Sequence, residues 1–250
     1  MFLRPCGQAH EMSAWAVLQA RMSSTRMPGK ILRKAAGRSV LEWVVRATSA
    51  TRGIDGVCIA IPYKDKHSPL VEEAYRLGVE VAFGSETDVL SRFVRAADQI
   101  GADVIMRVTT DCPLSDPCIN AQVLALLEDG VDYACNNEPF AFPHGLDCEV
   151  FTHKILKQAD QEATEQYDRE HVTPWIKRTT NVNRRYLIGP GGEAALWRWT
   201  VDYPEDFEFF NAIADTLGDG LSDSARVSAY LLNNPHLHEI NRLRRQRCEI

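Results

Sequence analysis

The sequence predicts an α/β protein with a Rossmann-like, mostly parallel sheet and helices on both faces. Short apolar runs alternate with longer amphipathic runs along the first half of the chain. The short runs are apolar over their whole length, as is typical of strands that are buried on both faces. Strands that alternate with helices pair in parallel through right-handed crossovers, which places helices on both sides of the sheet.

The first half of the chain contains the clearest elements. Strands are expected at residues 15–20, 57–61, 79–83, 104–108 and 133–135. The helices between them are expected at residues 40–47, 70–77, 89–100 and 119–127. Ser39 is a suitable N-cap for the first helix, while Pro62 and Gly84 end their strands.

The second half has a less regular pattern. Residues 136–146 are rich in aromatic residues, Asn and Pro and are expected to form a loop. Strands are expected at 148–151, 184–188 and 196–201, and helices at 154–164, 169–179, 204–217 and 224–233. Pro204 suits the first turn of its helix.

We expect one domain over residues 14–250. Residues around 136–200 form an insertion in it that completes the same sheet. Residues 1–13 lack the apolar core of a signal peptide and are expected to be a disordered lead-in. The alternative is a later start at Met12, which stands just before the first strand.

Composition excludes several classes of protein. The chain has 250 residues, 45% hydrophobic and 25% charged, enough for a large core. Its net charge of −6 creates no general attraction for nucleic acid or an anionic membrane, and no apolar run is long enough for a membrane span. The seven cysteines form no C-x-x-C pair, which argues against a zinc site or a disulfide framework. Reduced thiols and a cytoplasmic location are therefore expected.

The ligand site is expected at one edge of the sheet. In open α/β sheets, ligands bind outside the carboxyl ends of the strands. The loops at that edge are residues 21–30, 62–68, 84–88 and 109–116. We therefore expect these four loops to converge.

The loop after the first strand has the composition of a phosphate site. Its cations are Arg21, Arg26 and Lys30, its hydroxyls come from Ser23, Ser24 and Thr25, and Gly29 permits close backbone approach. Guanidinium groups match phosphate oxygens, and Lys30 adds a compact charge. The loop has no Walker motif, and the chain has no G-x-G-x-x-G. The alternative is a solvated basic turn.

Two aspartates follow strands that end at the same edge. Asp111 comes after the strand at 104–108, and Asp202 comes after the strand at 196–201. Mg²⁺ prefers one or two carboxylates together with phosphate oxygens and water. We therefore predict that both aspartates bind Mg²⁺. The alternatives are an N-cap role for Asp202 and a turn role for Asp111.

Other polar residues have two readings each. Arg107 can reach phosphate or form an ion pair at the edge of the core. Asp147 and Glu149 alternate along a short strand and can face a ligand or simply solvent. His144 can bond a hydroxyl group of a ligand, whereas His171 is better explained as a capping or core histidine than as a catalyst.

Several sequence blocks together resemble a known superfamily. The segment ARMSSTRMPGK, residues 20–30, looks like the signature of the CMP-sugar synthetases, and within them of the spore coat polysaccharide biosynthesis protein F group. Further matching blocks follow in order: GSETDVL (84–90), RVTTDCPL (107–114), GLDCEVF (145–151), REHVTP (169–174) and TVDYPEDF (200–207). The resemblance covers roughly residues 14–242, and several blocks in order are more specific than any one alone.

The resemblance implies a GT-A-like nucleotidyltransferase fold, CTP as donor and Mg²⁺ as cofactor. The chain is then expected to be a cytidylyltransferase that transfers CMP to a hydroxyl of a small sugar or sugar acid in glycan precursor synthesis, with release of pyrophosphate. The implied catalytic residues are Arg21, Lys30, Asp111 and Asp202, and the last two bind the metal. The implied nucleotide-binding residues are Ala20, Arg21, Ser23, Ser24, Thr25, Arg26, Gly29, Lys30, Ser85, Asp88, Arg107 and Thr110. The implied acceptor-binding residues are His144, Asp147, Glu149, Arg169 and His171.

Three positions depart from the pattern of that superfamily. Ser23 and Thr110 stand where Gly is usual, and Tyr203 stands where Thr is usual. These changes bear on acceptor size and rate, and they keep open a non-catalytic nucleotide-binding partner. A glycosyltransferase that uses a nucleotide sugar is a second alternative, although the Asp-x-Asp motif common in those enzymes is replaced by Asp-Cys-Pro at 111–113. By analogy with relatives, a homodimer through residues 136–146 and 184–200 is a further expectation.

Overall fold

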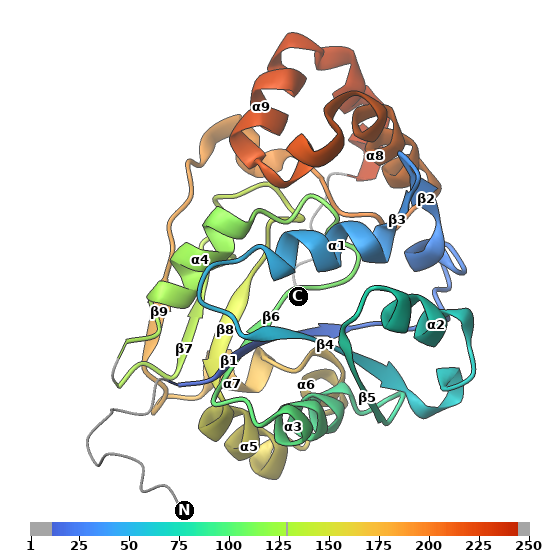
Figure 1. Ribbon diagram of the computed structural model, residues 1–250. Coiled ribbons are helices and arrows are strands. Elements are labelled where there is room, and N and C mark those ends of the chain that lie inside the picture. The colour runs from blue at the N-terminus through green and yellow to red at the C-terminus, as the bar shows by residue number, and fades with distance from the viewer. Residues whose placement is uncertain (1–11, 129, 245–250) are drawn as a thin grey trace, which may run out of the picture.

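A computed structural model describes residues 12–128 and 130–244 of the chain. Seven of its strands form one sheet with the order β5-β4-β1-β6-β8-β7-β9 (Figure 1). These strands are β1 Ala14–Gln19, β4 Gly56–Pro62, β5 Glu80–Gly84, β6 Val104–Arg107, β7 Tyr133–Cys135, β8 Glu149–Thr152 and β9 Arg184–Tyr186. The short hairpin of β2 (Lys34–Ala35) and β3 (Arg38–Ser39) lies apart from this sheet.

Most pairs in the sheet are parallel, as predicted. Strand β1 pairs in parallel with β4 on one side and β6 on the other, and β4 pairs in parallel with β5. Strand β8 is antiparallel to both β6 and β7, and β9 is parallel to β7. Strands from both halves of the chain therefore build one sheet, and the carboxyl ends of β1, β4, β5 and β6 lie at one edge.

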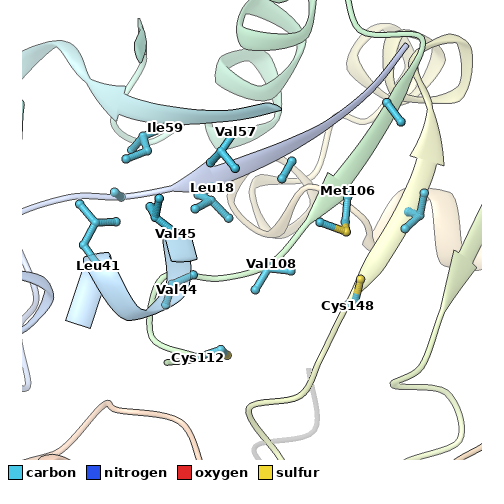
Figure 2. Close-up of a cluster of buried hydrophobic side chains, with 14 of the residues drawn as sticks. Leu18, Leu41, Val44, Val45, Val57, Ile59, Met106, Val108, Cys112 and Cys148 are labelled. Carbon is cyan, nitrogen blue, oxygen red and sulfur yellow. The ribbon is translucent and has the colours of Figure 1, made fainter. Parts of the chain in front are cut away.

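One face of the sheet is covered by three helices: α1 Val40–Ser49, α2 Pro69–Arg76 and α4 Pro117–Ala125. Figure 2 shows Leu41, Val44 and Val45 of α1 close to Leu18 of β1 and Ile59 of β4. These side chains are at most 4% exposed. The predicted cap of α1 is confirmed, because the Ser39 hydroxyl accepts the Glu42 amide.

The other face is covered by α3 Val89–Ile100, α5 His153–Glu162, α6 Gln166–His171 and α7 Pro174–Arg178 (Figure 1). Phe93 of α3 and Leu156 of α5 are fully buried there together with Phe151 of β8. The predicted helix over 169–179 is wrong, because the backbone turns at Val172 with φ 73° before Pro174 restarts the helix.

A third layer is built from the C-terminal helices α8 Pro204–Leu217 and α9 Ser224–Asn233, which lie beyond α1 in Figure 1. Its core contains Trp199, Phe209 and Phe210, and it also buries Met27 of the loop after β1 and Trp43 of α1. This layer fixes that loop against the rest of the molecule.

Two further predictions need correction. Residues 196–201 do not form a strand: the 3₁₀ helix Gly192–Leu196 is followed by an extended segment with one isolated bridge, between His144 and Arg198. The helix expected at 119–127 begins earlier, because Asp116 caps it and Pro117 opens it.

Of the expected lead-in at 1–13, residues 1–11 lie outside the described part of the chain. Ser13 belongs to the fold, because its amide donates to Asp103 and its hydroxyl to Asp55. Among the described residues, no helix has the length and apolar character that crossing a membrane requires.

Candidate active site

The loop after β1 is a compact turn. The Ala20 amide donates to the Ala60 carbonyl at 3.2 Å and so continues the ladder between β1 and β4. The Met22 carbonyl accepts the amides of Ser24 and Gly29, which closes the loop on itself. Gly29 has φ 68°, a left-handed conformation that glycine adopts at little cost, and it opens the 3₁₀ turn Lys30–Leu32.

The polar side chains of this loop differ in their surroundings. The Ser24 hydroxyl accepts the Met27 amide at 3.3 Å, so it supports the turn. The exposed polar side chains are those of Arg21, Ser23, Thr25 and Arg26. Met27, only 2% exposed, anchors the loop in the C-terminal core. The C-terminal core thus anchors the loop through Met27, and two guanidinium groups and two hydroxyl groups of the loop face solvent.

Lys30 joins the two aspartates that were predicted to bind a metal. Its Nζ lies 2.8 Å from Asp202 Oδ1 and 3.4 Å from Asp111 Oδ2, and it also donates to the Val201 carbonyl at 2.8 Å. The Lys30 side chain is 17% exposed. Residues distant in sequence therefore meet at one ammonium group, and the reading of Lys30 as part of a solvated turn is wrong.

Backbone contacts explain how the two aspartates come together. The Asp111 carbonyl accepts the Val201 amide at 2.7 Å and the Thr200 hydroxyl at 3.1 Å. The segment that carries Asp202 is thereby attached directly to the turn that carries Asp111.

Local charges hold Asp111 ionised. Burial alone would raise the pKa of Asp111, but the Lys30 charge and the Thr109 hydroxyl, 2.5 Å from Oδ1, hold that pKa well below its ordinary value. In turn, burial would lower the pKa of Lys30, but Asp111 and Asp202 raise it. The two carboxylates thus share one ammonium group, that of Lys30.

Arg198 and Asp206 fix Asp202, and both were missed from the sequence. The Arg198 guanidinium donates to Asp202 Oδ2 at 3.0 Å and to both carboxylate oxygens of Asp206, at 2.9 and 3.0 Å. Asp206 is fully buried and also accepts the amides of Asp202 and Tyr203, so it caps α8. The alternative reading of Asp202 as an N-cap is therefore wrong, and its carboxylate is left for Lys30 and Arg198.

Signals for both residues exist in the sequence. Arg198 lies between two tryptophans, Trp197 and Trp199, where an arginine is buried only with partners. Asp206 occupies the third position of a helix opened by Pro204, where an acidic residue accepts free backbone amides.

The loop of His144 packs against the Arg198 segment. His144 Nδ1 lies 3.3 Å from Arg198 Nη1, and the two residues form a bridge through the Trp199 amide and the His144 carbonyl at 2.7 Å. Gly145 has φ 117°, and a Cβ there would lie 2.7 Å from the Trp199 carbonyl carbon. Asp147 accepts the Gly145 amide at 2.9 Å. His144 is therefore placed beside the carboxylate pair, while Asp147 supports its loop.

The four loops at the sheet edge converge, as predicted. Asp65 of the second loop accepts the Met22 amide at 2.9 Å, and Lys64 forms an ion pair with Glu86 of the third loop. A polar recess of about 90 Å³ opens beside the first loop, lined by Arg21, Glu86, Thr87, Gln166 and Glu170. Lys30 connects the first loop to Asp111 of the fourth.

Several predicted nucleotide contacts take part in internal bonds. Ser85 accepts the Asp88 amide, and Asp88 caps α3 through the Ser91 amide. Arg169, expected on the acceptor, donates to both carboxylate oxygens of Asp88, at 3.0 and 2.5 Å. The Thr110 hydroxyl donates to the Gln19 carbonyl at 2.8 Å. Contacts of these residues with nucleotide or acceptor stay predictions.

Glu149 is buried, so the reading that it faces solvent is wrong. It is 2% exposed and accepts from Arg107, from Lys177 at 3.1 Å and from the Tyr133 and Thr173 hydroxyls at 2.6 and 2.9 Å. Burial would raise the pKa of Glu149, but the charges of Lys177 and Arg107 lower it to about 2. The ion-pair reading of Arg107 is therefore the one found in the structure.

His171 ends α6, and its ring lies 4.5 Å from that of Tyr167. Partial burial lowers its pKa, so the imidazole is mostly neutral at neutral pH. These surroundings are those of a packed side chain.

The donor set of the carboxylate pair suits a hard divalent cation. Asp111 and Asp202 offer carboxylate oxygens, the ligands that Mg²⁺ prefers, and a bound triphosphate would supply others. Within residues 12–128 and 130–244, no cluster of three or more His, Cys, Asp or Glu gathers as a complete metal cage. Lys30 already neutralises part of the negative charge. Such a site would therefore hold a metal together with its phosphate ligand.

Comparisons with known proteins agree with the geometry. Residues 15–212 match the family model described as cytidylyltransferase. The chain is 33% identical over 239 residues to an uncharacterized protein of Methanocaldococcus jannaschii, covering 94% of this chain and 97% of that protein. It is 32% identical over 229 residues to the spore coat polysaccharide biosynthesis protein SpsF of Bacillus subtilis, covering 88% and 94%. A cytidylyltransferase structure from Leptospira borgpetersenii superposes with a TM-score of 0.85 at 26% identity, covering 90% and 96%.

Proposed function

Since this chain belongs to the cytidylyltransferase family, we propose that it transfers CMP from CTP to a hydroxyl of a sugar or sugar acid, and that Asp111, Asp202 and Lys30 carry the reaction. The observation that supports this most is the meeting of Lys30 with both aspartates at the edge of the sheet. The family match favours nucleotidyl transfer over glycosyl transfer. The similarity to a polysaccharide biosynthesis protein supports a glycan precursor as the acceptor.

The residues of the chain have separable tasks in this proposal. Arg21, Arg26 and Lys30 bind the β- and γ-phosphates and neutralise the departing pyrophosphate. Asp206 and Arg198 keep Asp202 in place through paired hydrogen bonds. His144, which contacts Arg198, bonds the acceptor in this proposal. Transfers of this type depend mainly on positioning and charge neutralisation, so no general base is assigned.

Mg²⁺ is the proposed cofactor, and Asp111 and Asp202 would hold it. When bound, it would withdraw charge from the α-phosphate and favour attack by the acceptor hydroxyl. Lys30 has three N–H donors and can pass from the carboxylates to phosphate oxygens without losing all its bonds.

Release of pyrophosphate tests the activity. The purified protein is incubated with Mg²⁺, each of the four nucleoside triphosphates and a panel of neutral sugars and 2-keto sugar acids. We expect pyrophosphate with CTP and one class of acceptor, and none after chelation with EDTA. Asp111→Asn should lose roughly 30- to 1,000-fold in kcat/KM, the scale of one lost charged contact in a transition state. Asp215→Asn, an exposed change on α8, is the control. Release of a nucleoside diphosphate from a nucleotide sugar would support the glycosyltransferase instead, and CTP binding without product would support a non-catalytic partner.

We also propose a homodimer through the β9 edge of the sheet. Large apolar side chains are exposed on this part of the chain, namely Tyr186 (40%), Ile188 (62%) and Leu196 (65%). Exposed large apolar side chains are typical of protein interfaces when they form one patch. Light scattering should give the mass of a dimer, and Ile188→Asp together with Leu196→Asp should give that of a monomer. A wild-type monomer at micromolar concentration contradicts the proposal.

The proposed location is the cytoplasm. The described cysteines Cys58, Cys112, Cys118, Cys135 and Cys148 are free thiols, the state that a reducing compartment maintains.

A further inference from the structure

The Tyr203 ring is surrounded by three guanidinium groups. The Cζ atoms of Arg244, Arg26 and Arg198 lie 4.1, 5.0 and 5.7 Å from its centroid. They come from three separate parts of the chain: the C-terminal 3₁₀ turn Arg242–Arg244, the loop after β1, and the extended segment before Asp202. All three distances are in the range of cation–π contacts. The ring therefore joins the C-terminal segment to the phosphate loop.

The C-terminal segment that carries Arg244 is itself fixed to the rest of the protein by a buried side chain. Asn241 is 2% exposed, and its amide nitrogen donates to the Arg198 carbonyl at 3.0 Å and to Asp206 Oδ1 at 3.1 Å. Arg244 follows three residues later and also lies 3.4 Å from Glu205. The position of Arg244 is thus set by the same two residues that orient Asp202.

Arg26 is the member of the group that needs support. Its side chain is 50% exposed, and its ion pair with Asp202 is long, at 3.6 Å. An exposed arginine in such a pair keeps much of its rotamer freedom, and that freedom must be lost when a ligand binds. The Tyr203 ring beside the Arg26 guanidinium limits the rotamers that this side chain can adopt. This contact does not depend on Asp202, so it remains when Asp202 binds another partner.

We propose that Tyr203 and Arg244 are positioning residues that hold Arg26 at the entrance of the carboxylate pair, ready to bind the triphosphate. This inference rests on the proposed function and assigns a role to two residues that touch no reacting atom. Arg244 fixes the Tyr203 ring, and the ring fixes Arg26. Their effect should fall on the affinity for CTP, because pre-organisation reduces the cost of ordering Arg26 on binding.

Calorimetric binding of CTP, together with KM and kcat from pyrophosphate release, tests the proposal. Tyr203→Leu removes the ring and should weaken CTP binding roughly fivefold to tenfold, and Arg244→Ala should weaken it about threefold. The kcat of both variants should stay within about twofold of wild type. Tyr203→Phe retains the ring and should restore most of the affinity. Arg242→Ala is the matched control, since Arg242 lies in the same turn, is 60% exposed and pairs with Glu239.

The coupling between residues is the sharper test. If Arg244 acts through Arg26, adding Arg244→Ala to Arg26→Ala should change the CTP affinity by less than about 1.5-fold, because the group that it positions is gone. Full additivity of the two changes overturns the proposal, as does equal weakening by Arg244→Ala and Arg242→Ala, or a fall in kcat with CTP affinity unchanged. A wild-type protein that binds CTP but forms no product contradicts the proposed activity, while the binding comparison still decides the positioning. A wild type that binds no CTP contradicts both.

Discussion

Replacement of Glu149 by Gln tests whether this carboxylate supports the sheet or binds the acceptor. The side chain is buried at the start of β8 with Arg107, Lys177 and two hydroxyl groups as partners. Glutamine keeps the shape but removes the charge, which leaves two partly buried cations, Arg107 and Lys177, facing a neutral amide. The structure therefore predicts a loss of stability and places the cause in the charge.

The magnitude follows from the pKa of Glu149. Folding lowers this pKa from 4.5 to about 2, which corresponds to roughly 3 kcal/mol of stability at neutral pH. Because the folded pKa lies below the unfolded one, this contribution is complete above about pH 4.5 and is lost as the pH falls towards 2. The unfolding free energies of wild type and Glu149→Gln should thus differ by roughly 3 kcal/mol at pH 7 and should approach each other at pH 2–3.

Urea unfolding at pH 7, 5, 4 and 3, followed by circular dichroism, measures this difference. Glu208→Gln, an exposed change on α8, should follow the wild-type curve at every pH. A Glu149→Gln protein as stable as wild type at pH 7, but with a raised KM for the acceptor, would refute the structural role and support acceptor binding.

Three further predictions concern the site. Lys30→Met should lower kcat/KM for CTP by roughly 30- to 1,000-fold in the pyrophosphate assay, whereas the exposed Lys34→Met should change it less than about twofold; equal effects of the two would contradict the role of Lys30. Asp206→Asn should destabilise the protein by about 3–5 kcal/mol in urea unfolding, because it leaves Arg198 buried with its charge partly unmatched, and a loss below about 1 kcal/mol would count against this network. Gly145→Ala should cost about 2–4 kcal/mol, since a side chain is strained at φ 117° and its Cβ would meet the Trp199 backbone; an unchanged melting temperature would show that the loop adapts.

The sequence predicted an element correctly where a local pattern, such as hydrophobic periodicity, was enough to distinguish a helix from a strand. The apolar strands and the amphipathic helix Val89–Ile100 were found because hydrophobic period alone distinguishes them. The strand predicted at 196–201 was wrong because the alternation of Trp197 and Trp199 with polar residues reproduces the pattern of a half-buried strand. Their side chains are buried against the C-terminal helices, and the backbone has only one bridge, to His144. The alternating pattern predicted correctly which side chains are buried. It could not predict whether the backbone of this segment pairs with another strand.

Some residues of the site could be predicted from the sequence and others could not. Lys30 and Asp111 could be found because they follow strands that end at one edge of a parallel sheet. Asp202 was predicted from a strand at 196–201 that the structure does not contain, and the hydrogen bond from the Val201 amide to the Asp111 carbonyl brings it to the same place. Glu149 and Arg169 could not be placed, because their partners come from elements whose relative positions are set only by packing. Lys177, which pairs with Glu149, lies on a helix whose start depends on the turn at Val172. The sequence shows that a residue is charged. Whether that residue supports the fold or binds a ligand depends on its burial and on its partners, which the sequence does not show.

The arrangement of charges explains why this carboxylate pair is stable before any ligand arrives. The negative charges of two carboxylates within reach of one ammonium repel each other, and in a partly buried site that repulsion is only weakly screened. Lys30 lies between them, and Arg198 neutralises Asp202 from the other side while Asp206 keeps Arg198 in place. Lys30 is held only by side chains and one carbonyl, so an incoming triphosphate can compete for it, whereas Arg198 is fixed by a fully buried partner. In the proposed function, Lys30 is therefore the cation that would move to the triphosphate, and Arg198 is the cation that keeps the donors pre-organised.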